Sequence, residues 1–280
     1  MFRLKVAHSP DSDDAFMYWG IATGAVKAEG IEFVQALSDI ESANAVAARD
    51  AEYDLTAISV GASPYLADKY LVLGSGASFG DGYGPILVVP VGAKAMKAED
   101  LAGKRIAVPG LRTSAALALK LRLAEHVAVP MDFKAVGAAA KKGEVDAALV
   151  IHEGQLTAHE EGLRVVEDLG RWWTGRTGLP LPLGMNAVKR ALPEDVRKKA
   201  AIAWKQSIDL GLAQRGPALD YAMSFARGLE REKADKFVGM YVNAWTSELG
   251  PRGREAVARF LGEAAERGYA PKVKIEFQER

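Results

Sequence analysis

Short apolar runs alternate with amphipathic helical patterns along the first two thirds of the chain, and this alternation limits the possible fold more than any other feature. Alternation of this kind is typical of βαβ units and predicts a mostly parallel sheet. The elements predicted first are strands at residues 4–7, 31–35 and 54–59 and helices at about residues 13–22, 40–48 and 62–68.

A second series of the same kind begins near "GPILVVPVGA", and the pattern then changes to helices only. The second series predicts strands at 105–108, 131–134, 147–151 and 163–169, with helices at 114–123 and 136–142. After about residue 192, helices are predicted at 194–214, 217–229 and 254–268, with proline at two starts and glycine at the ends.

Two sheet units followed by a helical return suggest two lobes with a ligand cleft between them. The chain would cross between the lobes in the extended runs "PILVVPV" and "LPLGMNAV". We therefore predict one discontinuous lobe from residues 1–87 and 186–280, and a second lobe from residues 88–185.

The charge balance and the absence of cysteine exclude several classes of protein. Thirty-six basic residues offset 36 acidic ones, so no overall field draws the chain to nucleic acid or to an anionic membrane. There is no cysteine, which excludes disulfides, thiolate nucleophiles and cysteine-ligated metals. No secretory leader or membrane span is recognisable in the sequence, so a cytoplasmic protein is the simplest expectation.

Polar residues follow several predicted strands, and in open α/β sheets ligands bind beyond the carboxyl ends of strands. The first strand leads into "AHSPDSDDAF" and ends at His8 and Ser9. Either Asp11 or Ser12 caps the next helix while Asp13 and Asp14 suit its positive end, or the clustered carboxylates accept hydrogen bonds from a polyol. The strand in "DLTAISVGASPY" ends near Thr56 and Ser59, which suit either a ligand oxygen or an ordinary capping turn.

Two more predicted strands end beside residues that suit ligand binding or proton transfer. In "AVPGLRTSAALAL", Thr113 and Ser114 open a helix whose free amides suit a carboxylate or phosphate, although no P-loop signature is present. In "AALVIHEGQLT" an apolar run stops at His152 and Glu153. A lone histidine is more often structural than catalytic, yet an imidazole at a strand end suits proton transfer near neutral pH.

Other chemistries have little support. No G-x-S-x-G nucleophile elbow exists, and "GASFGDGYG" matches no dinucleotide fingerprint, so we interpret it as a mobile loop over the cleft. His8 with Asp11 and Asp13 is an unspecific metal pattern, and we predict no metal site. Trp172, Trp173 and the other helical aromatic residues are interpreted as core.

Several motifs together resemble a known family. "HSPDSDDAF", "LTAIS", "GASFGDGYGP", "RIAVPGLRTSA" and above all "GEVDAALVIHEGQLT…GLRVVEDLGRWWTGRTGLPLPLG" are similar to the 1,4-dihydroxy-6-naphthoate synthases of the futalosine pathway of menaquinone biosynthesis, the MqnD family. The similarity covers nearly the whole chain and is most specific from residue 143 to residue 184. It lies within a superfamily that also contains chorismate dehydratase (MqnA) and solute-binding proteins.

The resemblance implies a type II periplasmic-binding-protein fold used for catalysis without a cofactor. The substrate would be cyclic dehypoxanthinylfutalosine, a small carboxylate, and the products 1,4-dihydroxy-6-naphthoate and dihydroxyacetone. The family's catalytic histidine, its proton acceptor, falls on His152. The substrate-binding residues would be Ala57, Ile58, Ser59, Thr113, Ser114 and Asn44, to which we add Ser9, Asp11, Asp13 and Ile151 from the neighbouring strand ends.

One segment departs from the family pattern. The family usually has "SPCPNDTF" where this chain has "SPDSDDAF", so carboxylates stand at Asp11 and Asp13. The substrate's carboxylate should then lie away from these two residues. The alternatives that stay open are a non-catalytic solute-binding protein, an effector-sensing domain and a sister enzyme of the chorismate dehydratase type; the oligomeric state is not predicted.

Overall fold

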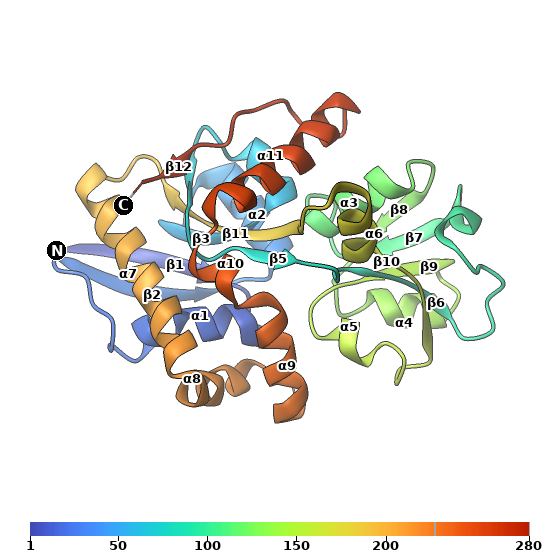
Figure 1. Ribbon diagram of the computed structural model, residues 1–280, viewed down its shortest axis with the longest axis horizontal. Coiled ribbons are helices and arrows are strands. Elements are labelled where there is room, and N and C mark those ends of the chain that lie inside the picture. Colours follow the sequence, from blue (N-terminus) through green and yellow to red (C-terminus); the bar gives the residue numbers. More distant parts are fainter. Residues whose placement is uncertain (227, 280) are drawn as a thin grey trace.

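The computed structural model describes residues 1–226 and 228–279, which form two α/β halves joined side by side (Figure 1). The first half is built on a seven-stranded sheet and the second half on a five-stranded sheet. Both chain ends lie on the first half, and the second half contains only residues from the middle of the chain (Figure 1). The cavity described below is lined by residues from both halves.

The seven-stranded sheet has the order β12-β4-β11-β3-β1-β2, and β5 pairs with β11. Its strands are β1 (Phe2–His8), β2 (Ile31–Leu37), β3 (Leu55–Ser59), β4 (Tyr70–Leu73), β5 (Ser78–Gly80), β11 (Leu181–Lys189) and β12 (Phe277–Gln278). The central strand β3 is buried along its whole length, which explains its continuous apolar character.

The five-stranded sheet has the order β10-β6-β9-β7-β8. Its strands are β6 (Ile86–Pro90), β7 (Arg105–Val108), β8 (Val127–Pro130), β9 (Ala147–Val150) and β10 (Leu163–Asp168). Strand β9 lies in the middle of the sheet and is buried, so its carboxyl end is held firmly where His152 follows it.

Both sheets are mixed, which differs from the mostly parallel sheets that the alternation predicted. Strands β1, β2 and β3 are mutually parallel, but β11 pairs antiparallel with both β3 and β4. In the second half, β6 pairs antiparallel with β9 and β10, whereas β7 is parallel to its neighbours. The antiparallel strands β6 and β11 are those in the predicted crossing runs, because a chain that crosses to another sheet and returns enters it against the local strand direction.

The helices pack on the two sheets (Figure 1); they are interspersed with the strands up to β11 and then follow one another along the chain. They are α1 (Ser12–Ala22), α2 (Ile40–Asp50), η1 (Val60–Tyr65), η2 (Ala98–Leu101), α3 (Ser114–Arg122), α4 (Val136–Lys141), α5 (Gly154–Thr157), α6 (Leu169–Thr177), α7 (Glu194–Ala213), α8 (Arg215–Ala222), η3 (Met223–Phe225), α9 (Arg231–Tyr241), α10 (Ala244–Ser247) and α11 (Gly250–Glu266). Among the described residues, none of the helices combines the length and the apolar composition of a membrane span.

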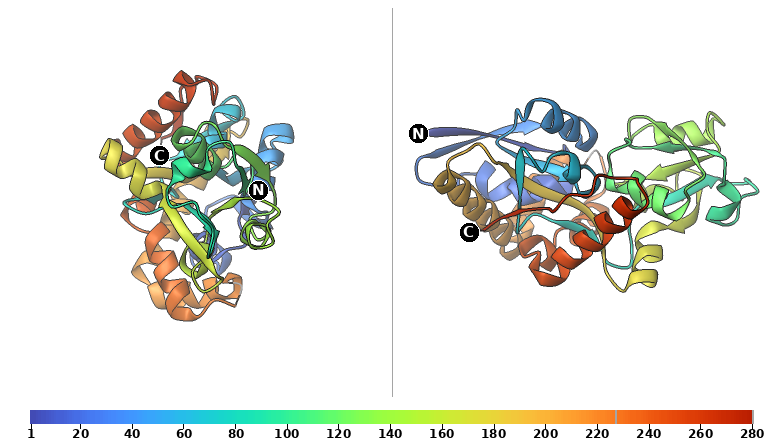
Figure 2. Two further views of the ribbon diagram at one scale, coloured as in Figure 1. Left: turned by 90° about the vertical axis from the view of Figure 1, so that its right-hand side faces the viewer. Right: turned by 90° about the horizontal axis from the view of Figure 1, so that it is seen from above.

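Helix α11 ties the two halves together. In the view from above it extends along the first half toward the second (Figure 2). Arg176 of α6 donates to Glu263 of α11 at 2.6 Å, and Arg267 donates to the carbonyl oxygen of Leu121 at the end of α3 at 3.0 Å. The C-terminal helices therefore return to the first half and also contact the second.

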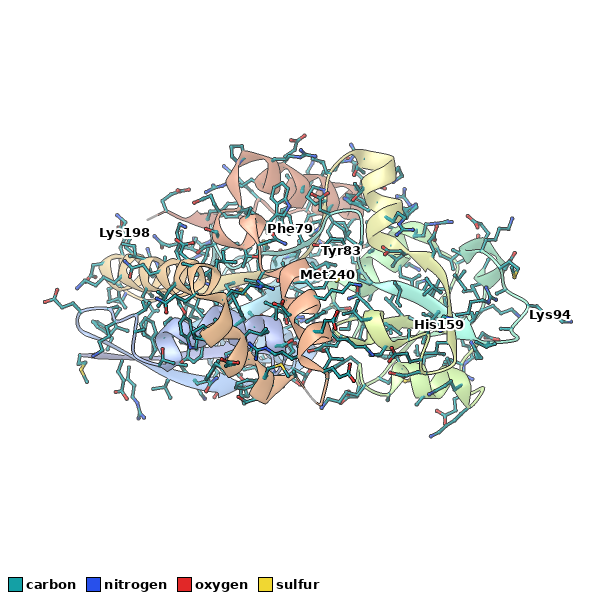
Figure 3. All side chains as sticks on the ribbon, turned by 60° about the horizontal axis from the view of Figure 1, so that its bottom comes forward. Phe79, Tyr83, Lys94, His159, Lys198 and Met240 are labelled. Carbon is teal, nitrogen blue, oxygen red and sulfur yellow. The ribbon has the colours of Figure 1, made fainter. Side chains whose placement is uncertain are left out.

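Two glycines face each other where the chain crosses between the sheets. A Cβ atom on Gly170 would lie 1.8 Å from the carbonyl oxygen of Tyr83, and one on Gly84 would lie 2.9 Å from the backbone of Gly170. The hydroxyl of Tyr83 donates to the carbonyl oxygen of Met240, next to it in Figure 3. Only residues without side chains allow the crossing segment and the start of α6 to approach this closely.

Several predicted elements differ from the observed ones. Strand β8 ends at Pro130, so the predicted strand at 131–134 is wrong; β8 is a four-residue edge strand whose first and last residues are exposed. The predicted helix at 62–68 is the 3-10 helix η1, and Pro64 inside it lacks the amide hydrogen that an α-helix needs. Arg227, inside the predicted helix at 217–229, lies outside the described residues.

The glycine-rich segment at 76–84 is not a mobile loop over the cleft, because it contains strand β5. Phe79 is fully buried in the first half (Figure 3), pairs with Pro182 of β11 and lies 5.8 Å from the ring of Trp245. Helix α9 was not predicted, although Ala234, Phe237 and Tyr241 have helical spacing and are buried.

Candidate active site

A cavity lies between the two halves, where the two sheets meet. It is lined by the carboxyl ends of β1, β3 and β9, the start of α3, and parts of β5, β11 and α9. All of the predicted site residues except Asn44 line it: Ser9, Asp11, Asp13, Ala57, Ile58, Ser59, Thr113, Ser114, Ile151 and His152. These residues lie together because they follow the carboxyl ends of strands, where ligands bind in open α/β sheets.

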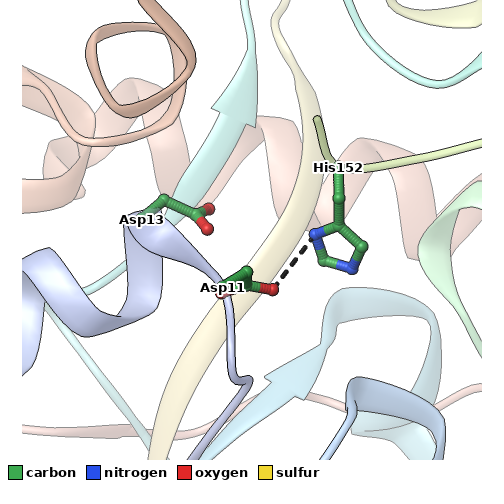
Figure 4. Close-up of side chains that lie close together, drawn as sticks. All are labelled: Asp11, Asp13 and His152. Carbon is green, nitrogen blue, oxygen red and sulfur yellow. Dashed lines mark ion pairs between the residues drawn. The ribbon is translucent and has the colours of Figure 1, made fainter. Parts of the chain in front are cut away.

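His152 stands at the edge of the second half, directly after β9. Its backbone φ is 55°, in the left-handed region that, among the described non-glycine residues, it shares with Ala51. Its Nδ1 lies 3.2 Å from Oδ2 of Asp11 (Figure 4), and its ring meets the ring of Phe133 edge-on, with 5.0 Å between centroids. The side chain is 18% exposed, so a ligand in the cavity can reach the imidazole.

The turn between β1 and α1 brings three carboxyl groups to the cavity. Asp11 occupies the N-cap position of α1, but its side chain makes no capping hydrogen bond and turns toward His152 instead. Asp13 lies beside it, and Asp14 accepts a hydrogen bond of 2.7 Å from the backbone amide of Ser9. The predicted capping role of Asp11 is therefore wrong.

The charge on this turn is smaller than its three carboxyl groups suggest. Burial raises the pKa of Asp13 well above its usual range, and the neighbouring charge of Asp11 raises it further. Burial, together with the charge of Asp13, raises the pKa of Asp14 to about 8. A raised pKa favours the protonated form of an acid, so Asp14 is largely neutral at pH 7, and Asp13 is shifted in the same direction.

The end of β3 is fixed by Asn44 from behind. The side-chain amide of Asn44 donates to Oγ of Ser59 at 3.0 Å, and its Oδ1 accepts from the backbone amide of Ser59 at 2.9 Å. Asn44 is buried and does not line the cavity, so it orients Ser59 and does not face a ligand.

The start of α3 presents backbone amides to the cavity. The hydroxyl of Thr113 caps the helix by accepting from the amide of Ala116 at 3.1 Å. The hydroxyl of Ser114 accepts from the amide of Gly61 at 2.9 Å and donates to the carbonyl oxygen of Leu183 at 2.5 Å. Since both hydroxyls are engaged, the groups that remain for an anion are the first amides of the helix, at Ser114 and Ala115.

Two residues that line the cavity, Tyr241 and Asn186, were not predicted from the sequence as site residues. Tyr241 of α9 donates to Oε1 of Gln155 at 2.8 Å and so joins the two halves. Asn186 of β11 donates to the carbonyl oxygen of Gly76 at 2.8 Å, while its buried Oδ1 accepts no hydrogen bond. The helical spacing of α9 was a usable signal for Tyr241, but no local pattern identifies Asn186.

The second strand-end histidine has a structural role. His8 is fully buried, its Nδ1 lies 2.8 Å from the carbonyl oxygen of Ser9, and its Nε2 lies 2.8 Å from the amide nitrogen of Gln35. Burial lowers the pKa of His8 to about 4, so it stays neutral at pH 7. It does not line the cavity, and the group with ligand spacing among the described residues is Asp11, Asp13 and His152.

Comparison with known proteins gives matches over nearly the whole chain. A family model described as menaquinone biosynthesis matches residues 4–266 of the chain. A curated protein of Thermus thermophilus, named 1,4-dihydroxy-6-naphtoate synthase, is 36% identical over 270 residues, covering 96% of this chain and 97% of that protein.

Solved structures confirm the predicted fold class. A protein from Archaeoglobus fulgidus has a TM-score of 0.87 at 42% identity, covering 95% of this chain and 98% of its own. The alkanesulfonate-binding protein from Xanthomonas axonopodis has a TM-score of 0.70 at 14% identity, covering 97% of this chain and 95% of its own. The second likeness is one of fold alone: a two-lobed α/β fold of the periplasmic-binding-protein kind.

Proposed function

Because this chain belongs to the menaquinone-biosynthesis family, as its motifs predicted, and is an enzyme of that biosynthesis, we propose that it cleaves cyclic dehypoxanthinylfutalosine. The products are 1,4-dihydroxy-6-naphthoate and dihydroxyacetone. One observation carries the proposal: a single partly exposed imidazole, His152, lines a cavity between the two halves. The reaction takes place in the cytoplasm, and the small carboxylate substrate is the only molecule that it requires.

His152 starts the reaction as a general base in this proposal. Its neutral imidazole takes one proton from the substrate, the carbon–carbon and carbon–oxygen bonds of the sugar-derived ring break, and the ring system becomes aromatic. The imidazolium then returns the proton to the departing dihydroxyacetone. The two products together contain all the atoms of the substrate, so the step consumes no water, oxidant or second substrate.

The remaining cavity groups hold the substrate. The first amides of α3, at Ser114 and Ala115, bind the carboxylate, since they are directed donors at the positive end of a helix. Ser59, oriented by Asn44, and Ser9 bind ring oxygens. Closing of the predicted lobes (residues 1–87 with 186–280, against 88–185) excludes water and aligns the base.

The direct test is incubation of the purified protein with cyclic dehypoxanthinylfutalosine while the absorbance of the naphthoate product is followed. We expect turnover without added cofactor and equal amounts of naphthoate and dihydroxyacetone. A parallel incubation with chorismate should give no product. Turnover of chorismate alone would place the chain with the dehydratases and overturn the proposal, as would binding of the futalosine derivative without conversion.

The position of the carboxylate is tested at Ala115, which lines the cavity and is 4% exposed. We expect Ala115→Asp to raise KM at least about tenfold above that of the isosteric Ala115→Asn, because only the former places a like charge beside the bound anion. An acidic residue in the first turn does not weaken the helix, so folding should be preserved. Equal KM values for the two variants would show that the carboxylate binds elsewhere.

A further inference from the structure

Two consecutive residues of one half contact two consecutive residues of the other beside the cavity. Asp11 lies 3.2 Å from His152, and the hydroxyl of Ser12 donates to Oε1 of Glu153 at 3.2 Å. The first pair of residues follows β1 of the seven-stranded sheet, and the second follows β9 of the five-stranded sheet. The contact between His152 and Asp11 therefore exists only when the two halves are together.

We propose that Asp11 is a positioning residue: its carboxylate accepts the Nδ1–H of His152 and so leaves Nε2 unprotonated as the base. This inference rests on the proposed function and assigns a role that comes from the segment in which this chain departs from the family pattern. The role is indirect, since Asp11 acts through the imidazole.

The geometry selects one form of the imidazole. A neutral imidazole carries its proton on either nitrogen, and a carboxylate beside Nδ1 stabilises the form protonated there. Asp11 has a side chain that is 1% exposed, so water screens its charge little. The same charge stabilises the imidazolium that forms when Nε2 takes a proton, as a buried carboxylate does in other acid–base sites.

Asp13 holds the carboxylate of Asp11 in place. The two carboxyl groups are close enough to share a hydrogen bond, and burial together with the charge of Asp11 raises the pKa of Asp13, which favours its protonated form. A protonated Asp13 donates to Asp11, which then accepts from Asp13 on one side and from His152 on the other. With the shared proton on Asp13, the negative charge of the pair lies on Asp11, beside the imidazole.

The decisive variant is Asp11→Asn, which keeps the size of the side chain and removes its charge. We expect kcat for the futalosine derivative to fall about 100-fold or more while KM changes less than about threefold. Asp195→Asn, at the exposed start of α7, is the matched control and should retain full activity. A kcat of Asp11→Asn within threefold of the parent value overturns the proposal.

The second measurement does not depend on turnover. Nitrogen NMR of the imidazole-labelled protein, with the His152 signal assigned by its loss in His152→Asn, should show Nδ1 protonated in the parent and a mixture of both forms in Asp11→Asn. An Nε2-protonated parent overturns the proposal even if the enzyme is active. If substrate is not converted at all, the proposed function fails while the NMR result still decides the role of Asp11.

A metal titration tests the remaining alternative, that these residues form a metal site. Asp11, Asp13 and His152 offer ligand atoms within 4.8 Å of one another. We expect no stoichiometric uptake of Zn²⁺ or Mg²⁺ by the parent protein in calorimetry. Tight binding of one ion per chain, lost in Asp11→Asn, would make this cluster a metal site and overturn the positioning role.

Discussion

Replacing His152 by asparagine will lower kcat for the futalosine derivative by about 10³-fold or more. General-base catalysis contributes about 10²–10⁴-fold, and an amide cannot take a proton. Asparagine is the appropriate substitution because His152 has a φ of 55°, and asparagine tolerates this left-handed conformation better than alanine does. Its side-chain amide can also donate to Asp11 in place of Nδ1.

The result is interpretable only if the variant folds. We expect circular dichroism and the unfolding temperature of His152→Asn to match the parent within a few degrees, and the product naphthoate to bind with similar affinity. Activity above a tenth of the parent value in a folded variant would show that another group removes the proton. The mechanism would then have to be rebuilt around a different residue of the cavity.

Replacing Gly170 by alanine will destabilise the protein by about 3 kcal/mol or more. The added methyl would lie 1.8 Å from the carbonyl oxygen and 2.1 Å from the carbonyl carbon of Tyr83, and backbone atoms cannot move aside as the end of a side chain can. For a chain of this size we expect the unfolding midpoint to fall by about 6–9 °C.

A control for this effect lies in the same helix. Gly175 of α6 is exposed and has nothing within 4 Å of the methyl group that alanine would add, so Gly175→Ala should leave stability unchanged or raise it by up to about 1 kcal/mol. Helix propensity alone would make both substitutions favourable. Opposite signs for the two variants identify close packing at the crossing as the cause, and equal shifts would contradict that explanation.

The sequence predicted those parts of the fold whose burial is local and regular. Strand β3 and helices α3 and α4 lie close to the predicted bounds because each buries a continuous apolar run or face. Strand β8 was misplaced because it is only four residues long and lies at the edge of its sheet, where burial fixes its bounds weakly. The short strand β5 was taken for a loop because it lies in a glycine-rich segment. Only the folded structure reveals that a Cβ atom on its Gly80 would lie 2.0 Å from the carbonyl oxygen of Tyr83.

The site was predictable where the strand-end rule applies and not beyond it. The rule identified His152, Ser59 and the start of α3, all of which line the cavity. It could not pair Asp11 with His152, because the two residues are brought together by two different sheets. It also could not assign the hydroxyl of Ser114, whose partners come from η1 and β11.

The left-handed backbone conformation at His152 lowers the stability of the folded protein, and the same residue places an imidazole in the cavity. Glycine or asparagine would adopt that conformation at lower energetic cost, so under the proposed mechanism the imidazole persists there only while selection for turnover favours it. A descendant of this protein that kept the cavity merely to capture its ligand would drift toward glycine or asparagine at this position and become harder to unfold. The identity of this one residue would thus record, over evolutionary time, whether a lineage still converts what it binds.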